Sequence, residues 1–182
     1  MALTLEEKRA LSNKKEHKKA REKEQVKARI QKAKETGNYR EWLPDTQRQR
    51  VYESEWAWNW GNPADRRISM EEAKEITEDF LAKPWVIERF GPQESIEIKP
   101  GRGGKTAWAY NAERKILFPE PCRYLEILIH EIAHILSPFG ARHGHEFCET
   151  FLYCVRHYFG EHEARVLANE FDNHYVEYGN NW

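Results

Sequence analysis

Cysteine and long apolar runs are scarce in this sequence, and each scarcity excludes a class of protein. The chain has three cysteines, Cys122, Cys148 and Cys154, which are too few for a disulfide framework or for a zinc site made of four thiolates. No stretch approaches the roughly 18 consecutive apolar residues of a transmembrane helix, and the N-terminus lacks the apolar segment of a secretory signal. We therefore expect a cytoplasmic protein with reduced thiols and no membrane contact.

Aromatic residues are almost missing from the first part of the chain. Tyr39 is the one aromatic residue among the first 40 positions, out of 23 in all 182 residues. The same segment carries 13 Lys and Arg against 6 Asp and Glu, whereas residues 41–182 carry 16 against 24. A segment with so few large apolar groups cannot build its own core. We therefore divide the chain into a basic extension, residues 1–40, and one domain, residues 41–182.

The basic extension lacks Gly and Pro from Thr4 to Lys34 and consists largely of Ala, Glu, Lys, Arg, Gln and Leu. These residues favour an α-helix, and too few of them are apolar to form a buried stripe. Two interpretations of its charge remain open. It is either a solvated helix that confers solubility, or a helix that binds nucleic acid or an acidic protein surface by charge attraction.

The middle of the domain is predicted to contain three short strands. Segments rich in β-branched and aromatic residues lie between turn residues at Ser95–Lys99, Thr106–Tyr110 and Lys115–Phe118. Short connections between consecutive strands favour antiparallel pairing. We expect a three-stranded antiparallel meander.

Helices are expected on both sides of these strands. Ser69 followed by Glu72 predicts a capping box at the start of one helix. The segment Tyr124–Leu136 is strongly apolar at helical spacing, and it is followed by helical patterns over 146–159 and 161–175. The fold class is therefore α+β, with the sheet packed on the apolar helix, further helices around it and the charged helix in front.

The apolar helix contains the sequence His130-Glu131-Ile132-Ala133-His134, which matches the pattern H-E-x-x-H. Residues four apart share one face of a helix, so both imidazoles can bind one metal ion. Glu131 lies one step round the helix, where its carboxylate can act as a general base on a water molecule. Polar groups are costly in such an apolar helix unless they have partners, which favours a metal site over an accidental match.

A catalytic zinc site needs a third protein ligand and leaves its fourth position to water. Several residues downstream of the motif carry suitable side chains. The candidates are His143, His145, Glu149, Glu161 and Glu163.

The combination of HEIAH and, after eight intervening residues, HGHEFCETF resembles the SprT-like zincins. In that pattern HExxH is followed by a variable loop and by HGxxF, whose His is the third ligand. The resemblance implies that His143 completes the site, while His145 stands at a variable position close enough to compete. The stretches RQRVYESE and AWAYNAERKILFPEPCRYLEILIHEIAHIL also resemble small metallohydrolases of actinobacteria and their phages.

The resemblance covers about residues 47 to 160 and implies a zincin-like metallopeptidase that uses Zn²⁺ and acts on a protein or peptide. Its substrate would lie along a strand edge, here expected at Lys115–Phe118. SprT-like proteases are associated with proteolysis of DNA-bound proteins, but the chain lacks the CxxC pair of the additional zinc module that many of them carry. A phage-encoded member would act in the host cytoplasm or the virion.

The leading hypothesis is a zinc peptidase in which His130, His134 and His143 bind the ion and Glu131 moves the proton. Tyr175 or Tyr178 is a candidate for stabilising the oxyanion. One alternative is a structural or binding protein of a phage or chromosome-associated assembly with zinc as a scaffold. Another is an ImmA-like regulatory peptidase with Glu161 as third ligand.

Three tryptophans at alternate positions, Trp56, Trp58 and Trp60, form the densest aromatic cluster. Such residues can stack on bases or sugars. We favour the interpretation that they cover one face of the core.

Overall fold

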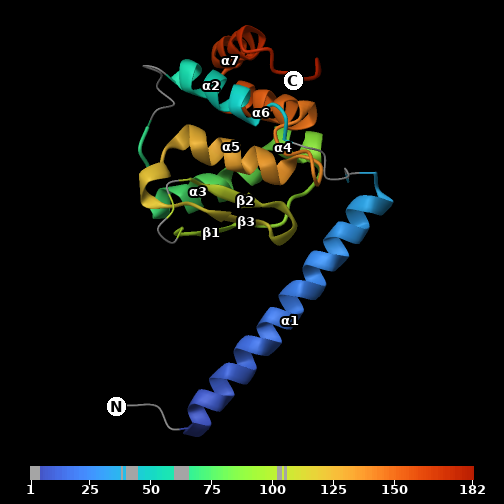
Figure 1. Ribbon diagram of the computed structural model, residues 1–182, viewed down its shortest axis with the longest axis vertical. Coiled ribbons are helices and arrows are strands. Elements are labelled where there is room, and N and C mark those ends of the chain that lie inside the picture. The colour runs from blue at the N-terminus through green and yellow to red at the C-terminus, as the bar shows by residue number, and fades with distance from the viewer. Residues whose placement is uncertain (1–4, 38, 40–44, 60–65, 102–103, 105) are drawn as a thin grey trace.

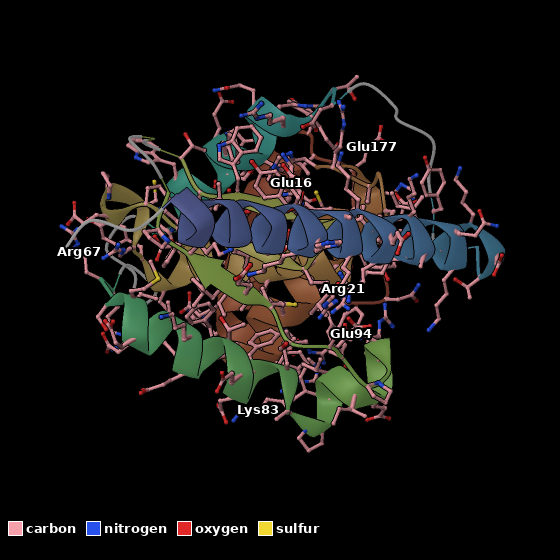
Figure 2. All side chains as sticks on the ribbon, turned by 90° about the horizontal axis from the view of Figure 1, so that it is seen from below. Glu16, Arg21, Arg67, Lys83, Glu94 and Glu177 are labelled. Atoms are coloured by element: carbon pink, nitrogen blue, oxygen red, sulfur yellow. The ribbon has the colours of Figure 1, made fainter. Side chains whose placement is uncertain are left out.

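The computed structural model describes residues 5–37, 39, 45–59, 66–101, 104 and 106–182, which form a long N-terminal helix and an α+β domain (Figure 1). The helix, α1, spans Leu5–Glu35, in agreement with the helix predicted between Thr4 and Lys34. Figure 2 shows charged side chains along α1, with Glu16 and Arg21 labelled, and residues 16–25 are all exposed. Among the described residues, no helix is long and apolar enough to cross a membrane.

The C-terminal third of α1 contacts the domain. Ala33 is buried, and the Arg29 guanidinium donates to the carbonyl of Ala112 at 3.2 Å and pairs with Glu94. The chain then forms an isolated parallel bridge between Tyr39 and Phe139. Thus α1 is anchored at one end, and the rest of it extends away from the domain (Figure 1).

The elements of the domain alternate between helices and short strands along the chain. In chain order they are α2 (Arg48–Asn59), α3 (Met70–Leu81), α4 (Pro84–Phe90), β1 (Glu97–Lys99), β2 (Trp108–Tyr110), the 3₁₀ turn η1 (Asn111–Glu113), β3 (Lys115–Leu117), the 3₁₀ turn η2 (Glu120–Cys122), α5 (Leu125–Leu136), α6 (His145–Tyr158) and α7 (Glu161–Asn173).

Helix α5 is the central element of the domain (Figure 1). The sheet and α3 pack on one side of it, α6 and α2 lie on the other, and α7 packs on both of these helices. Ten of its twelve residues are buried, as expected for its apolar sequence. His130 and Glu131 are therefore carried into the interior by the surrounding apolar residues, where polar groups need specific partners.

The sheet is mixed, so the predicted antiparallel meander is wrong in one pairing. Strand β3 lies between β1 and β2 and pairs parallel with β1 and antiparallel with β2. The tight turn at η1 forces β2 and β3 to be antiparallel, whereas the longer connection from β1 lets β2 pass to the far side of β3. As a result β2, and not β3, is the edge strand beside α5.

Local signals predicted most helix limits. The capping box of Ser69 and Glu72 is present, with both reciprocal hydrogen bonds formed. Helix α4 begins at Pro84 and was not predicted; proline is well tolerated in the first turn of a helix. Helix α2 was not predicted, because its apolar residues show no clear helical period.

Candidate metal centre

Three histidine side chains meet beneath α2 at the centre of the domain. His130 and His134 lie one turn apart on α5, and His143 comes from the loop between α5 and α6. One ring nitrogen from each lies within 4.8 Å of the other two, and the Nε2 atoms of His130 and His134 are 3.0 Å apart. This arrangement is close enough to hold a single metal ion.

The loop that carries His143 is shaped by close backbone packing. Gly144 donates its N–H to the carbonyl of Ala141 at 2.8 Å, and a Cβ at Gly144 would lie 2.9 Å from that oxygen. Arg142 adopts a left-handed conformation with φ 48°. The glycine is therefore required because the chain turns sharply directly after the histidine.

The side chain of Gln47 ties this loop to the C-terminal segment. Its amide nitrogen donates to the carbonyls of His143 at 2.7 Å and Glu177 at 3.0 Å. Its amide oxygen accepts the backbone N–H of Glu177 at 3.0 Å. Three parts of the chain that are far apart in sequence are thus held together beside the histidines.

In two of the three imidazoles, the ring nitrogen that faces away from the cluster contacts a carboxylate. Glu55 of α2 contacts Nδ1 of His130, and Asp45 contacts Nδ1 of His143 at 2.9 Å. Such a partner fixes the ring and its tautomer, so that Nε2 faces inward as a ligand. Sequence reasoning missed both residues, although Glu55 belongs to the stretch RQRVYESE that carries part of the resemblance.

Glu131 is buried beside the histidines but does not belong to the group of close ligand atoms. Burial raises the pKa of its carboxyl to about 7, and the charge of Glu55 adds to this, while His130 and the backbone N–H of Ala109 oppose it. A carboxyl that titrates near neutral pH can both accept and release a proton. The position therefore suits a general base.

The imidazoles differ in how readily they take up a proton. Burial lowers the pKa of His143 to about 4 and that of His134 well below its ordinary value. Burial has the same effect on His130 and is the largest single cause there, but the charge and hydrogen bond of Glu55 together with the charge of Glu131 outweigh it and raise the pKa. Two of the three rings are therefore neutral at pH 7 and present lone pairs to a cation.

The other candidate third ligands lie elsewhere. The His145 side chain is 60% exposed and lies 3.2 Å from Glu146. Glu149 pairs with Arg89, Glu161 with Arg156 and Arg165, and Glu163 accepts a hydrogen bond from Trp58.

Two cavities border the histidine cluster. One of about 660 Å³, called here the tryptophan cavity, is lined by Trp56, Trp58 and His130, among others. The other, of about 600 Å³, is called the α1 cavity because Val26 and Ile30 of α1 line it. Both are bordered by Tyr52, Thr106, Ala107 and Glu131.

Strand β2 forms part of the wall of the α1 cavity, to which it contributes Trp108, Ala109 and Tyr110. The strand expected in that place, Lys115–Phe118, contains β3, which is paired on both sides. The difference arises because β3 is inserted between the other two strands. The edge available beside the cluster is therefore that of β2.

The aromatic residues near the cluster do not all lie where they were expected. Trp58 is buried in the core, as predicted, but Trp56 is 67% exposed, and Trp60 lies outside the described residues. Tyr175 is 81% exposed, and the hydroxyl of Tyr178 donates to Asp172 at 2.9 Å.

Neither of these C-terminal tyrosines borders either cavity. Tyr52 of α2 lies beside the cluster instead, and sequence reasoning missed it. Burial is the main cause that raises the pKa of Tyr52 above its ordinary value, so its hydroxyl keeps its proton at neutral pH.

Comparison with known proteins finds no matching family model, no matching curated protein and no matching solved structure.

Proposed function

We propose that the protein is a zinc-dependent metallopeptidase of the SprT-like type, which hydrolyses peptide bonds of a protein substrate. The observation that carries the proposal is the cluster of three buried imidazoles with a buried carboxylate, Glu131, at the junction of two cavities. A core that needed histidines only for packing would have no use for this convergence. Three imidazole ligands, with the fourth position left to water, are typical of catalytic zinc sites.

The donor set fits a zinc ion. Nε2 of His143 is buried and has no hydrogen-bond partner among the described residues, although an unsatisfied buried polar atom is costly. The carboxylates of Asp45 and Glu55 contact the Nδ1 atoms of His143 and His130. In many zinc sites a carboxylate contacts the non-ligating nitrogen of the histidine in this way. When bound, zinc supplies Lewis acidity, which acidifies water and polarises a carbonyl group.

Glu131 moves the proton in the proposed reaction. Its carboxylate accepts a proton from the attacking water while the water oxygen forms a bond to the carbonyl carbon. It then donates that proton to the amide nitrogen as the carbon–nitrogen bond breaks, which leaves a carboxyl group and an amine. The backbone N–H of Ala109 bonds to the same carboxylate and fixes its orientation.

Strand β2 offers the substrate an extended edge. One side of β2 pairs with β3, and the cavity lies along its wall beside His134 and His143. A peptide added to this edge would run past the histidine cluster. This geometry favours a polypeptide substrate over a small amide.

The proposal is tested by metal analysis of the purified chain, followed by peptide identification after incubation with a cell lysate. We expect one zinc per chain and new peptide ends that appear with the wild type and not with Glu131→Gln. Bound zinc with no new ends in either sample would favour the alternative of a zinc scaffold. A folded protein that binds no metal would contradict both.

A further inference from the structure

We infer that Tyr52 is a catalytic residue, whose hydroxyl donates a hydrogen bond to the oxyanion that forms at the scissile carbonyl, and that Arg48 is its positioning residue. This role rests on the proposed peptidase function. It assigns to α2 the electrophilic part of the site, which the HExxH and HGxxF motifs do not contain.

The ring of Tyr52 lies against the histidine cluster. Its centroid is 5.0 Å from that of His143, in an edge-on arrangement, and 5.9 Å from that of His130. Tyr52 is also the one tyrosine, among the described residues, that borders both cavities. A carbonyl group that enters from either cavity towards the histidines therefore passes beside it.

Tyr52 and Glu131 approach this junction from different walls. Glu131 belongs to α5 and bonds to Ala109 of β2, whereas Tyr52 belongs to α2. Amide hydrolysis needs both a base for the water and a donor for the developing negative charge, and the two must act on different atoms. Groups from two different walls meet this requirement.

Arg48 is the donor placed beside the phenol of Tyr52. The two residues are one helical turn apart on α2, and the guanidinium carbon lies 5.4 Å from the centre of the Tyr52 ring. A guanidinium group can only donate, so the phenolic oxygen must accept. The hydroxyl proton of Tyr52 is thereby left to bond to another acceptor, such as a substrate oxygen.

The guanidinium of Arg48 also borders the α1 cavity, where it contacts both α2 and β2. It is 5.4 Å from the centre of the Tyr52 ring and 5.9 Å from that of Trp108 on β2. These contacts with two aromatic faces restrain the long side chain of Arg48. Its position beside Tyr52 is therefore held by contacts with both α2 and β2.

The step involves no transfer of the phenolic proton. The oxygen of water bonds to the carbonyl carbon, and the electron pair of the carbonyl double bond moves to its oxygen. Tyr52 stabilises this charge by donating a hydrogen bond, and Glu131 holds the proton that the water has lost. Collapse of the oxyanion expels the nitrogen, which takes that proton.

The test compares Tyr52→Phe with Tyr175→Phe in the zinc-loaded full chain. Tyr175 is the matched control because it is a largely exposed tyrosine outside both cavities. Three quantities are measured: zinc content, hydrolysis of labelled casein, and calorimetric binding of N-phosphoryl-leucinamide, a tetrahedral analogue. For Tyr52→Phe we expect full zinc content, little change in KM and a kcat lower by about 10²- to 10³-fold.

Binding of the analogue should weaken by about tenfold or more in Tyr52→Phe, because the lost bond is made to a tetrahedral oxygen. Tyr175→Phe should match the wild type in all three measurements. Arg48→Met should lower kcat, and Arg48→Lys, which keeps a donor, should restore part of it.

Equal affinity of the wild type and Tyr52→Phe for the analogue would overturn the role of Tyr52. So would absence of analogue binding by the zinc-loaded wild type, or loss of zinc from Tyr52→Phe. The analogue measurement decides the role whether or not casein is cleaved. Failure of the peptidase proposal is seen separately, as casein that stays intact with every variant.

Discussion

Asp45 holds His143 at two points: one carboxylate oxygen accepts the backbone N–H at 3.3 Å, and the other lies 2.9 Å from Nδ1. The backbone contact fixes the position of the residue, and the ring contact fixes the direction of Nε2. Glu55 makes the corresponding ring contact with His130. The segment before and within α2 thus orients the histidines of α5 and of the following loop.

Removing the charge of these carboxylates should weaken metal binding. We expect Asp45→Asn and Glu55→Gln each to lower zinc affinity by about 10- to 100-fold, because the imidazoles lose orientation and basicity. Competition with a chromophoric chelator measures the affinity. Glu53→Gln, an exposed change on the same helix, serves as the control. Unchanged affinity in both main variants would show that the ligands are oriented without them.

Glu131→Gln should retain zinc and the fold while losing hydrolysis. The amide occupies nearly the same space but cannot accept the proton, so the rate should fall by about 10²-fold or more. Zinc analysis, circular dichroism and casein cleavage measure the three properties. A variant with full activity would remove Glu131 from the mechanism and favour a structural role for the metal.

Separate replacement of His143 and His145 should show which of the two histidines binds zinc. His143→Ala removes a nitrogen of the buried cluster and should lose most bound zinc. His145→Ala changes a largely exposed side chain and should keep it. Native mass spectrometry counts the ions. Loss of zinc from His145→Ala alone would mean that His145, and not His143, is the third ligand.

Truncation of α1 should have an effect that depends on where it is made. Deleting residues 1–24 removes a part of the chain in which residues 16–24 are exposed, and it should change the free energy of unfolding by less than about 0.5 kcal/mol. Deleting residues 1–37 also removes buried Ala33 and the Arg29 hydrogen bond to Ala112, which should cost about 1 to 2 kcal/mol. Urea denaturation measures both. Equal stability of the two truncations would show that the contact contributes nothing.

The shorter truncation also tests the charge of the extension. Binding of the full chain to duplex DNA is expected to weaken as salt rises, because basic side chains displace counterions from phosphates. Deleting residues 1–24 should lower the affinity and flatten the salt dependence. Fluorescence anisotropy across a salt series measures both. The same affinity with and without these residues would leave solubility as the function of the charge.

The parts predicted from the sequence are those determined by short spacing. Three features of this kind were predicted, and each extends over only one to a few helical turns. They are the apolar period of α5, the capping box at Ser69 and the four-residue spacing of His130 and His134. The pairing of β3 with β1 could not be predicted, because local alternation does not reveal strand order. Asp45, Glu55 and Tyr52 reach the cluster from sequence positions 75 to 98 residues away from their partners, where no local pattern applies.

The hydrogen bonds of Gln47 have a consequence for biosynthesis. The loop of His143 is tied through Gln47 to the backbone of Glu177, so the nascent chain cannot complete this arrangement until residue 177 has left the ribosome. Domains fold as units during synthesis, and here a segment that emerges after α7 secures the loop that carries His143. A nascent chain would thus carry the HExxH helix before its third histidine is locked in place, and a mature site would arise only after translation has passed the final helix.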